Sequence, residues 1–155
     1  MLKQIILTLC LIGVSLESAA TEKRDTKCLT DNIYHEARSE SINGRISVGI
    51  ITINRAKQKF YDKPNPICSA VYEKGQFTWT RKRSVIKELD TYDDIKNLSK
   101  KLYTNYYLHD IIPYNLAKLK TIIYYAEKGY RPIKNGLRVA SIDSFYFWKP
   151  KKIKT

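Results

Sequence analysis

A short apolar run near the start of the chain divides the sequence into a leader and a working part. Ile5 to Leu16 is almost wholly apolar, follows a positive charge at Lys3, and is succeeded by small residues ending at Ala20. This order is typical of a secretory signal peptide, and Ser18 and Ala20 predict cleavage after Ala20. The run is shorter than the roughly 20 apolar residues of a membrane-spanning helix, which leaves an uncleaved anchor as the alternative. We therefore expect residues 1–20 to be a signal peptide and the protein to be exported to the periplasm, the cell wall or the medium.

The part that remains, residues 21–155, is long enough for one domain with a hydrophobic core and too short for two. The net charge of the chain is +13, and Lys3 and Glu17 cancel within the leader, so the domain keeps the whole of it. Such a charge predicts a polyanionic partner. Export argues against nucleic acid and favours an anionic cell-wall surface, to which we expect the domain to bind as a monomer.

The cysteines and histidines limit the covalent and metal chemistry of the domain. Cys10 lies in the leader, and the remaining Cys28 and Cys68 permit one disulfide in an oxidising compartment. Two buried thiols are the alternative. Because the histidines are only His35 and His109 and no paired Cys-x-x-Cys occurs, we expect no zinc site and no cofactor.

Apolar residues at spacings of three and four predict most of the secondary structure as helix. Gly49, within the second predicted helix, lowers helix propensity and suggests close approach of a neighbouring helix. Helices are expected from Cys28 to about Glu40, over Arg45–Lys57, over Ile67–Lys74 and over Tyr92–Leu108, with a break at Asn43-Gly44.

Aromatic and β-branched residues predict the extended segments. These are Gln76–Thr80, Thr121–Tyr125 and Leu137–Trp148, with a turn at Lys134-Asn135-Gly136 before the last of them. The polar segments Thr21–Lys27 and Lys149–Lys154 are expected to be loose. Together the pattern predicts an α+β domain that is mainly helical with a small antiparallel sheet.

Glu36 differs from the other acidic residues because it lies on an apolar helix stripe with Leu29, Ile33 and Ala37. Burial of a carboxylate raises its pKa, which suits a general acid. A structural ion pair with Arg38, Arg45 or Arg55 is the alternative explanation. Glu40, one helical turn further on, is a possible secondary carboxylate, although a solvent-facing position is its commoner role.

Aromatic residues form the second notable group, with 12 tyrosines in the chain. Flat rings with polar tips suit the binding of sugar rings and their hydroxyl groups, although filling of the core is an equal alternative for each ring. The candidates for lining a sugar-binding cleft are Gln76, Phe77, Trp79, Tyr124 and Tyr125.

The block CLTDNIYHEARSE, from Cys28 to Glu40, closely resembles the opening motif of the SleB-type cell wall hydrolases. Further segments that fall in the order of that family are Val48 to Arg55, Pro66 to Tyr72, Gly75 to Trp79, Tyr124 to Ala126, Arg131-Pro132 and Val139 to Ile142. The resemblance covers most of the chain after the leader. It implies a lysozyme-like fold and lytic transglycosylase activity on peptidoglycan glycan strands, with one essential glutamate at Glu36.

The chain also departs from the family. Ile123-Tyr124-Tyr125 stands where relatives often have His-Tyr-His, and Phe145 replaces a later histidine. Gly75 stands where many relatives have a cysteine that could pair with Cys68, which leaves the Cys28–Cys68 bridge open. The alternatives in function are a muramidase that adds water to the cleaved bond and a non-catalytic, cationic wall-binding protein.

Overall fold

The computed structural model describes residues 2–81, 84–129 and 136–150, with side chains from Ser18 to Lys149 within these ranges. Four α-helices come first and a three-stranded antiparallel sheet comes last, so the predicted α+β architecture is confirmed. The α-helices are α1 (Leu2–Ala37), α2 (Ile42–Lys59), α3 (Pro66–Val71) and α4 (Leu89–Leu102). The strands are β1 (Tyr124–Glu127), β2 (Gly136–Ile142) and β3 (Phe145–Pro150).

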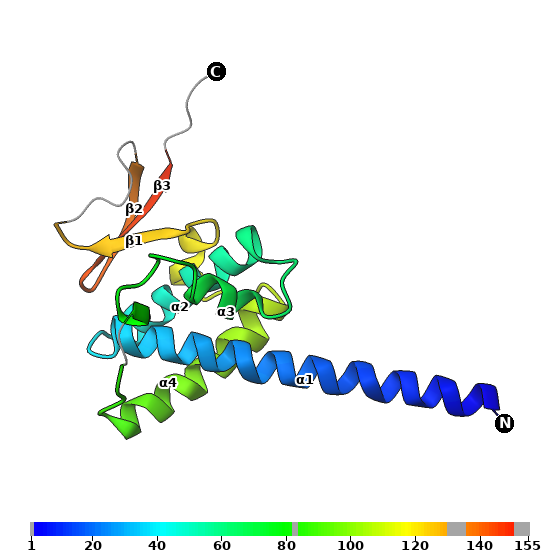
Figure 1. Ribbon diagram of the computed structural model, residues 1–155. Helices are drawn as coiled ribbons and strands as arrows, with labels where there is room; N and C mark the ends of the chain where they lie inside the picture. Colours follow the sequence, from blue (N-terminus) through cyan, green and yellow to red (C-terminus); the bar gives the residue numbers. More distant parts are fainter. Residues whose placement is uncertain (1, 82–83, 130–135, 151–155) are drawn as a thin grey trace, which may run out of the picture.

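Helix α1 runs without a break through the segment Thr21–Lys27, so the prediction of a loose segment there was wrong. The polar residues have tertiary partners that a sequence pattern cannot reveal: the carboxylate of Asp25 is buried and accepts from the backbone N–H of Cys68, 2.9 Å away. Figure 1 shows the first part of α1 extending away from the other elements. Among the described residues, no helix is long and apolar enough to cross a membrane.

Helix α2 begins at Ile42, which is earlier than predicted, because Ser41 caps it. The Ser41 hydroxyl accepts from the backbone N–H of Gly44, and Asp143 accepts from both the backbone N–H and the hydroxyl of Ser41. Asn43-Gly44, the predicted break, therefore lies in the first turn of α2. The chain leaves the helical conformation earlier, between α1 and Ser41.

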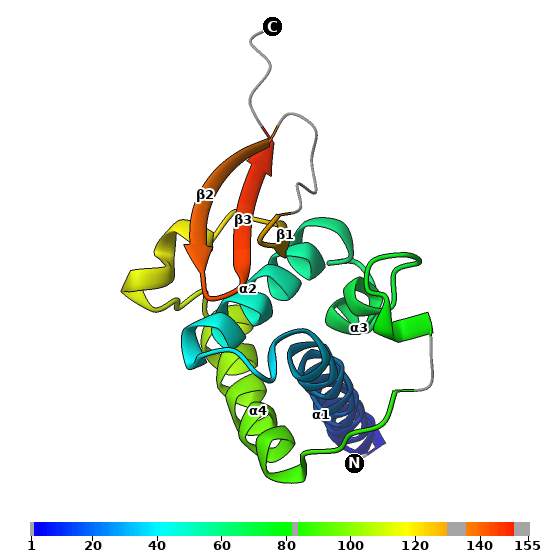
Figure 2. The same cartoon turned by 90° about the vertical axis from the view of Figure 1, so that its left-hand side faces the viewer.

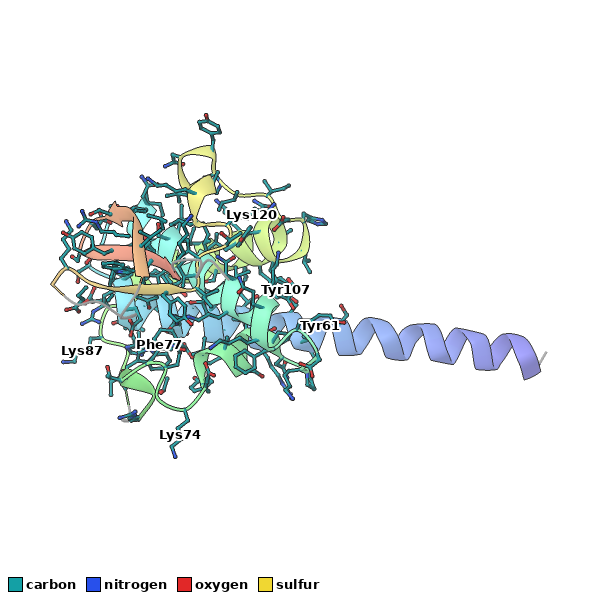
Figure 3. All side chains as sticks on the ribbon, turned by 90° about the horizontal axis from the view of Figure 1, so that it is seen from above. Tyr61, Lys74, Phe77, Lys87, Tyr107 and Lys120 are labelled. Carbon is teal, nitrogen blue, oxygen red and sulfur yellow. A yellow bond between two sulfur atoms is a disulfide. The ribbon has the colours of Figure 1, made fainter. Side chains whose placement is uncertain are left out.

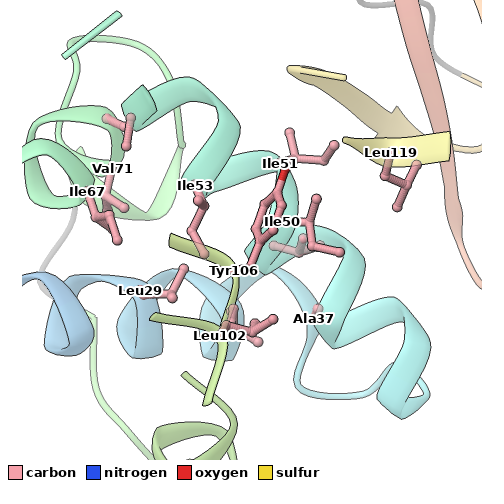
Figure 4. Close-up of a cluster of buried hydrophobic side chains, with 14 of the residues drawn as sticks. Leu29, Ala37, Ile50, Ile51, Ile53, Ile67, Val71, Leu102, Tyr106 and Leu119 are labelled. Atoms are coloured by element: carbon pink, nitrogen blue, oxygen red, sulfur yellow. The ribbon is translucent and has the colours of Figure 1, made fainter. Parts of the chain in front are cut away.

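Helices α2, α3 and α4 pack around the C-terminal half of α1, which Figure 2 views nearly along its axis. The expected close approach at Gly49 is confirmed, since a Cβ there would lie 2.5 Å from Leu102 Cδ1 and 3.0 Å from Ile33 Cδ1. Cys28 of α1 and Cys68 of α3 form a disulfide, with their Cα atoms 5.2 Å apart. Figure 4 shows part of the buried cluster between these helices.

Several predictions after α2 differ from the structure: α3 ends at Val71 and not at Lys74, and β1 covers Tyr124–Glu127 and not Thr121–Tyr125. Gln76–Thr80 is not a strand: the chain turns at Gly75, whose φ of +82° suits glycine, and forms a short 3₁₀ turn over Trp79–Arg81. The predicted helix Tyr92–Leu108 is α4 followed by a π-helical segment, Tyr103–Leu108. A 3₁₀ segment, Tyr114–Leu119, then leads to the sheet.

The sheet has the strand order β1-β3-β2 and lies beside α2, on the side of the molecule away from the free end of α1 (Figure 1). The segment predicted as one extended stretch, Leu137–Trp148, is a hairpin that turns at Asp143 and Ser144, where Asp143 adopts a φ of 46°. Of the predicted turn, Lys134 and Asn135 lie outside the described residues and Gly136 begins β2. Of the tail predicted to be loose, Lys149 belongs to β3 and residues 151–154 lie outside the described ranges.

Candidate active site

Glu36 lies in the last turn of α1, half-buried, and lines two of three neighbouring hollows. One hollow, of about 300 Å³, is also lined by Arg55, Trp79 and Tyr125. A second, of about 490 Å³, shares Glu36 with the first and extends towards the hairpin. A third, of about 260 Å³, shares His35 and Trp79 with the first. Because neighbouring hollows share residues, we treat them together as one groove, with Glu36 at the junction of two of them.

The carboxylate of Glu36 is held by one hydrogen bond, from the hydroxyl of Tyr125 to Oε2 at 3.0 Å. Burial raises the pKa of Glu36, which the Tyr125 hydrogen bond and the positive charge of Arg55 lower in part, while the negative charge of Glu127 raises it. No ion pair among the described residues involves Glu36. The arrangement favours a protonated carboxyl that can still ionise, as a general acid requires.

Tyr125 extends from β1 into the groove and packs its ring edge-on against Phe145, with ring centroids 5.2 Å apart. Burial, and then the negative charge of Glu36, raises the pKa of the Tyr125 hydroxyl well above its ordinary value. The hydroxyl therefore remains protonated and acts as a donor. Its lone described side-chain partner is the carboxylate of Glu36.

Helix α2 holds the segment that leads into β1 and thereby fixes Tyr125. The Asn54 amide donates to the carbonyls of Leu119 and Ile122, at 2.8 and 2.6 Å. Arg55 Nε donates to the carbonyl of Ile123 at 2.7 Å. These bonds give a structural reason for an Asn-Arg pair at this place in α2.

Arg55 is the main site residue that the sequence reasoning considered only as an ion-pair partner. Its side chain is 4 % exposed, and its guanidinium carbon lies 5.3 Å from the ring centroid of Phe77 and 5.4 Å from that of Tyr125. Burial lowers its pKa, and the nearby Glu36 raises it. A charged residue within the apolar pattern of α2, beside Ile50 and Ile53, was the signal that could have identified it.

The segment after Gly75 supplies the aromatic side of the groove. Trp79 donates from Nε1 to Asn32 Oδ1 at 3.2 Å, and its ring lies against His35, with centroids 4.5 Å apart and planes tilted by 34°. Asn32 precedes Glu36 by one helical turn, so α1 positions both groups. Burial lowers the pKa of His35.

Gln76 and Phe77 also line the groove, with different degrees of exposure. When the Gln76 side-chain amide is oriented so that its nitrogen and its oxygen each have a hydrogen-bond partner, the oxygen accepts from Arg55 Nη1 at 3.1 Å. Phe77 is only 5 % exposed and belongs to the hydrophobic core. Its ring serves mainly as a support for Arg55.

Tyr124 does not join the other candidates. Successive residues of a strand point to opposite faces, so Tyr124 and Tyr125 cannot both face the groove. Tyr124 is paired with Trp148 in the sheet, and it lines none of the three hollows. The structure thus brings Tyr125 into the lining of the groove and Tyr124 does not line it, so a role of Tyr124 in binding sugar stays a prediction.

Glu40 lines the same hollow as Glu36. It was expected on the same helix as Glu36, but α1 ends at Ala37, so Glu40 lies outside the helix. Its Oε2 accepts from the backbone N–H of Ser144 in the hairpin, at 3.2 Å. Glu127, at the end of β1, lines two of the hollows, and no sequence pattern had marked it as a candidate. No group of three or more His, Cys, Asp or Glu side chains in the described ranges is arranged to hold a metal ion.

Comparison with known proteins gives one match. A model of the cell wall hydrolase family matches residues 39–148, which include Arg55, Trp79, Tyr125 and Glu127. The match begins at residue 39 and so does not include Glu36. No curated protein and no solved structure matches the chain. Since the matched residues make up more than half of the sequence, the chain belongs to the cell wall hydrolase family, a family of enzymes that act on peptidoglycan.

Proposed function

We propose that this protein is a lytic transglycosylase of the SleB type, with a lysozyme-like fold and Glu36 as its acid and base catalyst. The observation that carries the proposal is the position of Glu36: a half-buried carboxyl at the junction of two hollows, bonded to Tyr125 and without an ion pair among the described residues. A structural carboxylate at such a position would be expected to have a close cationic partner.

The proposed reaction uses Glu36 twice. Its protonated carboxyl gives a proton to the oxygen between N-acetylmuramic acid and N-acetylglucosamine, and the bond from the muramoyl C1 to that oxygen breaks through an oxocarbenium-like state. The carboxylate then takes the proton of the muramoyl C6 hydroxyl, whose oxygen bonds to C1 and closes a 1,6-anhydro ring. Atoms balance without water, and Glu36 ends protonated as it began.

Other groove residues support this chemistry by holding the strand and the catalyst. Tyr125 donates to Oε2 of Glu36, and this bond strengthens when the carboxyl loses its proton. Trp79 and His35 offer ring faces to a sugar, and Gln76 offers an amide at the wall of the hollow. Phe77 acts through Arg55, and Tyr124 is not part of the proposed cleft.

We further propose that residues 1–20 are a signal peptide and that the protein works outside the cytoplasm as a monomer. The leader pattern of the sequence supports export, and the Cys28–Cys68 disulfide is of a kind that persists in oxidising compartments. The charge of +13 would hold the domain to an anionic wall.

A muramidase is the second candidate, and one observation favours it. Glu40 and Glu127 line the same hollow as Glu36, so two further carboxylates that could activate a water molecule share this hollow with the acid. Both residues belong to segments outside α1, and a hydrolase would use one of them to activate water or to form a covalent intermediate.

The test is mass spectrometry of the fragments that the purified protein releases from sacculi, with Glu36→Gln as the matched variant. Fragments ending in 1,6-anhydro-muramic acid, absent with the variant, are expected. Fragments heavier by one water would favour the muramidase. If neither protein releases fragments while both bind sacculi, the non-catalytic wall-binding alternative replaces the proposal.

A further inference from the structure

Arg55 brings a positive charge into the interior of the site without an ion-pair partner among the described residues. Its side chain is 4 % exposed, and none of the ion pairs among the described residues includes it. Its direct contacts are neutral groups, namely the Ile123 carbonyl, the Gln76 amide oxygen, and the rings of Phe77 and Tyr125, while Glu36 and Glu73 act on it through space. A buried charge without a close opposite charge is costly. The hollow that Arg55 lines also contains Glu36, which is the nearest candidate for a charge that appears during the reaction.

We propose that Arg55 is a positioning residue of this site: its buried guanidinium supplies the positive charge against which Glu36 ionises once it has given its proton to the substrate. The proposal rests on Glu36 being the acid catalyst. Arg55 acts through the field of its charge and through Tyr125, which it holds by ring contact and through the Ile123 carbonyl. Before the proton is transferred, the guanidinium faces a neutral carboxyl; afterwards it faces a carboxylate, so it stabilises the later state more.

The other ionisable groups near Glu36 differ from Arg55 in kind or in exposure. Tyr125 remains neutral, and burial lowers the pKa of His35, which favours its neutral form. The remaining groups around the second hollow, from the turn after α1, from β1 and from the hairpin, are Glu40, Glu127, Lys128 and Asp143. Glu127, Lys128 and Asp143 are exposed, so water screens their charges. Arg55 is therefore the buried cation of the site, and Glu127 acts on Glu36 in the opposite direction.

This opposition allows a test in which two variants shift one measured quantity in opposite directions. The quantity is the upper-pH limb of kcat/KM for release of fragments from sacculi, because activity falls as pH rises through the pKa of the acid catalyst. Removing the positive charge with Arg55→Gln is expected to move the limb to higher pH and to lower the maximum about tenfold or more. Removing the negative charge with Glu127→Gln is expected to move the limb to lower pH.

Two controls separate charge from structure. Arg55→Lys keeps the positive charge and loses the planar guanidinium group. The upper-pH limb of kcat/KM is therefore expected to stay near that of the wild type, even if the maximal kcat/KM falls. Lys74→Gln removes an exposed positive charge that points away from the body of the molecule (Figure 3), and it sets the shift to be expected from net charge alone. Thermal melts show which variants are folded.

A limb in Arg55→Gln that moves no further than in Lys74→Gln would overturn the proposal. If Arg55→Gln does not fold, Arg55→Lys carries the test, and a clearly displaced limb in that variant would overturn it. The assignment of Glu36 fails separately: Glu36→Gln would then retain activity, whatever Arg55 does. An inactive Glu36→Gln with an unmoved Arg55→Gln limb would leave the catalyst in place and remove only the role of Arg55.

Discussion

The two walls of the groove hold their charged groups in different ways. On the helical wall, formed by Glu36 of α1 and Arg55 of α2, the side chains are partly or wholly buried and bonded to the segment around β1. On the hairpin wall, formed by Glu127, Lys128, Asp143 and Ser144, the side chains are exposed. Charges near water interact weakly, whereas buried charges shift each other's ionisation. Location in the fold, more than residue type, therefore distinguishes the acids of this groove from one another.

The largest expected difference between the walls concerns their glutamates. Glu36→Gln is expected to lower the rate of fragment release from sacculi about 10³-fold, because the general acid is lost, while the melting temperature stays close to that of the wild type. Glu127→Gln, a matched change on the hairpin wall, is expected to retain most of the activity. A larger loss in Glu127→Gln than in Glu36→Gln would exchange the roles of the two walls.

The stability of the helical wall should also depend on the disulfide of the domain. The Cys28–Cys68 disulfide joins α1 to α3 and spans 40 residues of sequence. Replacing both cysteines by serine is expected to lower the free energy of unfolding by about 4 kcal/mol, mainly through the entropy of the unfolded chain. Urea unfolding measures this change. A loss below about 1 kcal/mol would mean that the bridge contributes little to the wall.

Tyr125 links the two walls, and its hydroxyl can be removed alone. Tyr125→Phe is expected to lower the maximal activity about tenfold, because the Glu36 carboxylate loses a donor. The same hydrogen bond lowers the pKa of Glu36, so its loss should move the upper-pH limb of kcat/KM to higher pH. Tyr124→Phe is the control, since Tyr124 lines none of the hollows. Equal effects of the two variants would contradict the assigned faces of β1.

The smallest expected effect belongs to the contact between the hairpin and the start of α2. Asp143 accepts from Ser41, the N-cap of α2, and has a positive φ that glycine tolerates. Asp143→Gly is expected to cost about 1 kcal/mol of stability, since the cap loses its support without added backbone strain. Fragment release should change little. A loss of activity larger than that of Tyr125→Phe would show that the hairpin wall takes part in the reaction.

The sequence predicted the helical wall better than the hairpin wall, for physical reasons. Helical periodicity and a carboxylate on an apolar stripe are local signals, and they predicted the helix that carries Glu36, the partial burial of that side chain and the close approach at Gly49. The partners of Asp25 and Ser41 lie far along the chain, so neither the helical conformation of Thr21–Lys27 nor the early start of α2 could be read locally.

Contacts between distant parts of the chain also limited what could be predicted about the site. Arg55 and Glu127 act on Glu36 through space, from α2 and β1, and no spacing in the sequence connects them with it. Tyr124 and Tyr125 are equivalent in composition, and only the alternation of a strand with a known register shows which of them faces the groove. The position of Glu40 depended on where α1 ends, and helix ends are among the least predictable features of a sequence.

The most direct test of the central claim is digestion of sacculi in oxygen-18-labelled water, followed by mass spectrometry of the released fragments. If Glu36 works alone as acid and then base, the C6 hydroxyl closes the ring, and the fragments carry no label at the new muramoyl ends. Incorporation of one labelled oxygen at those ends, dependent on Glu127 or Glu40, would contradict this account and make the protein a two-carboxylate hydrolase.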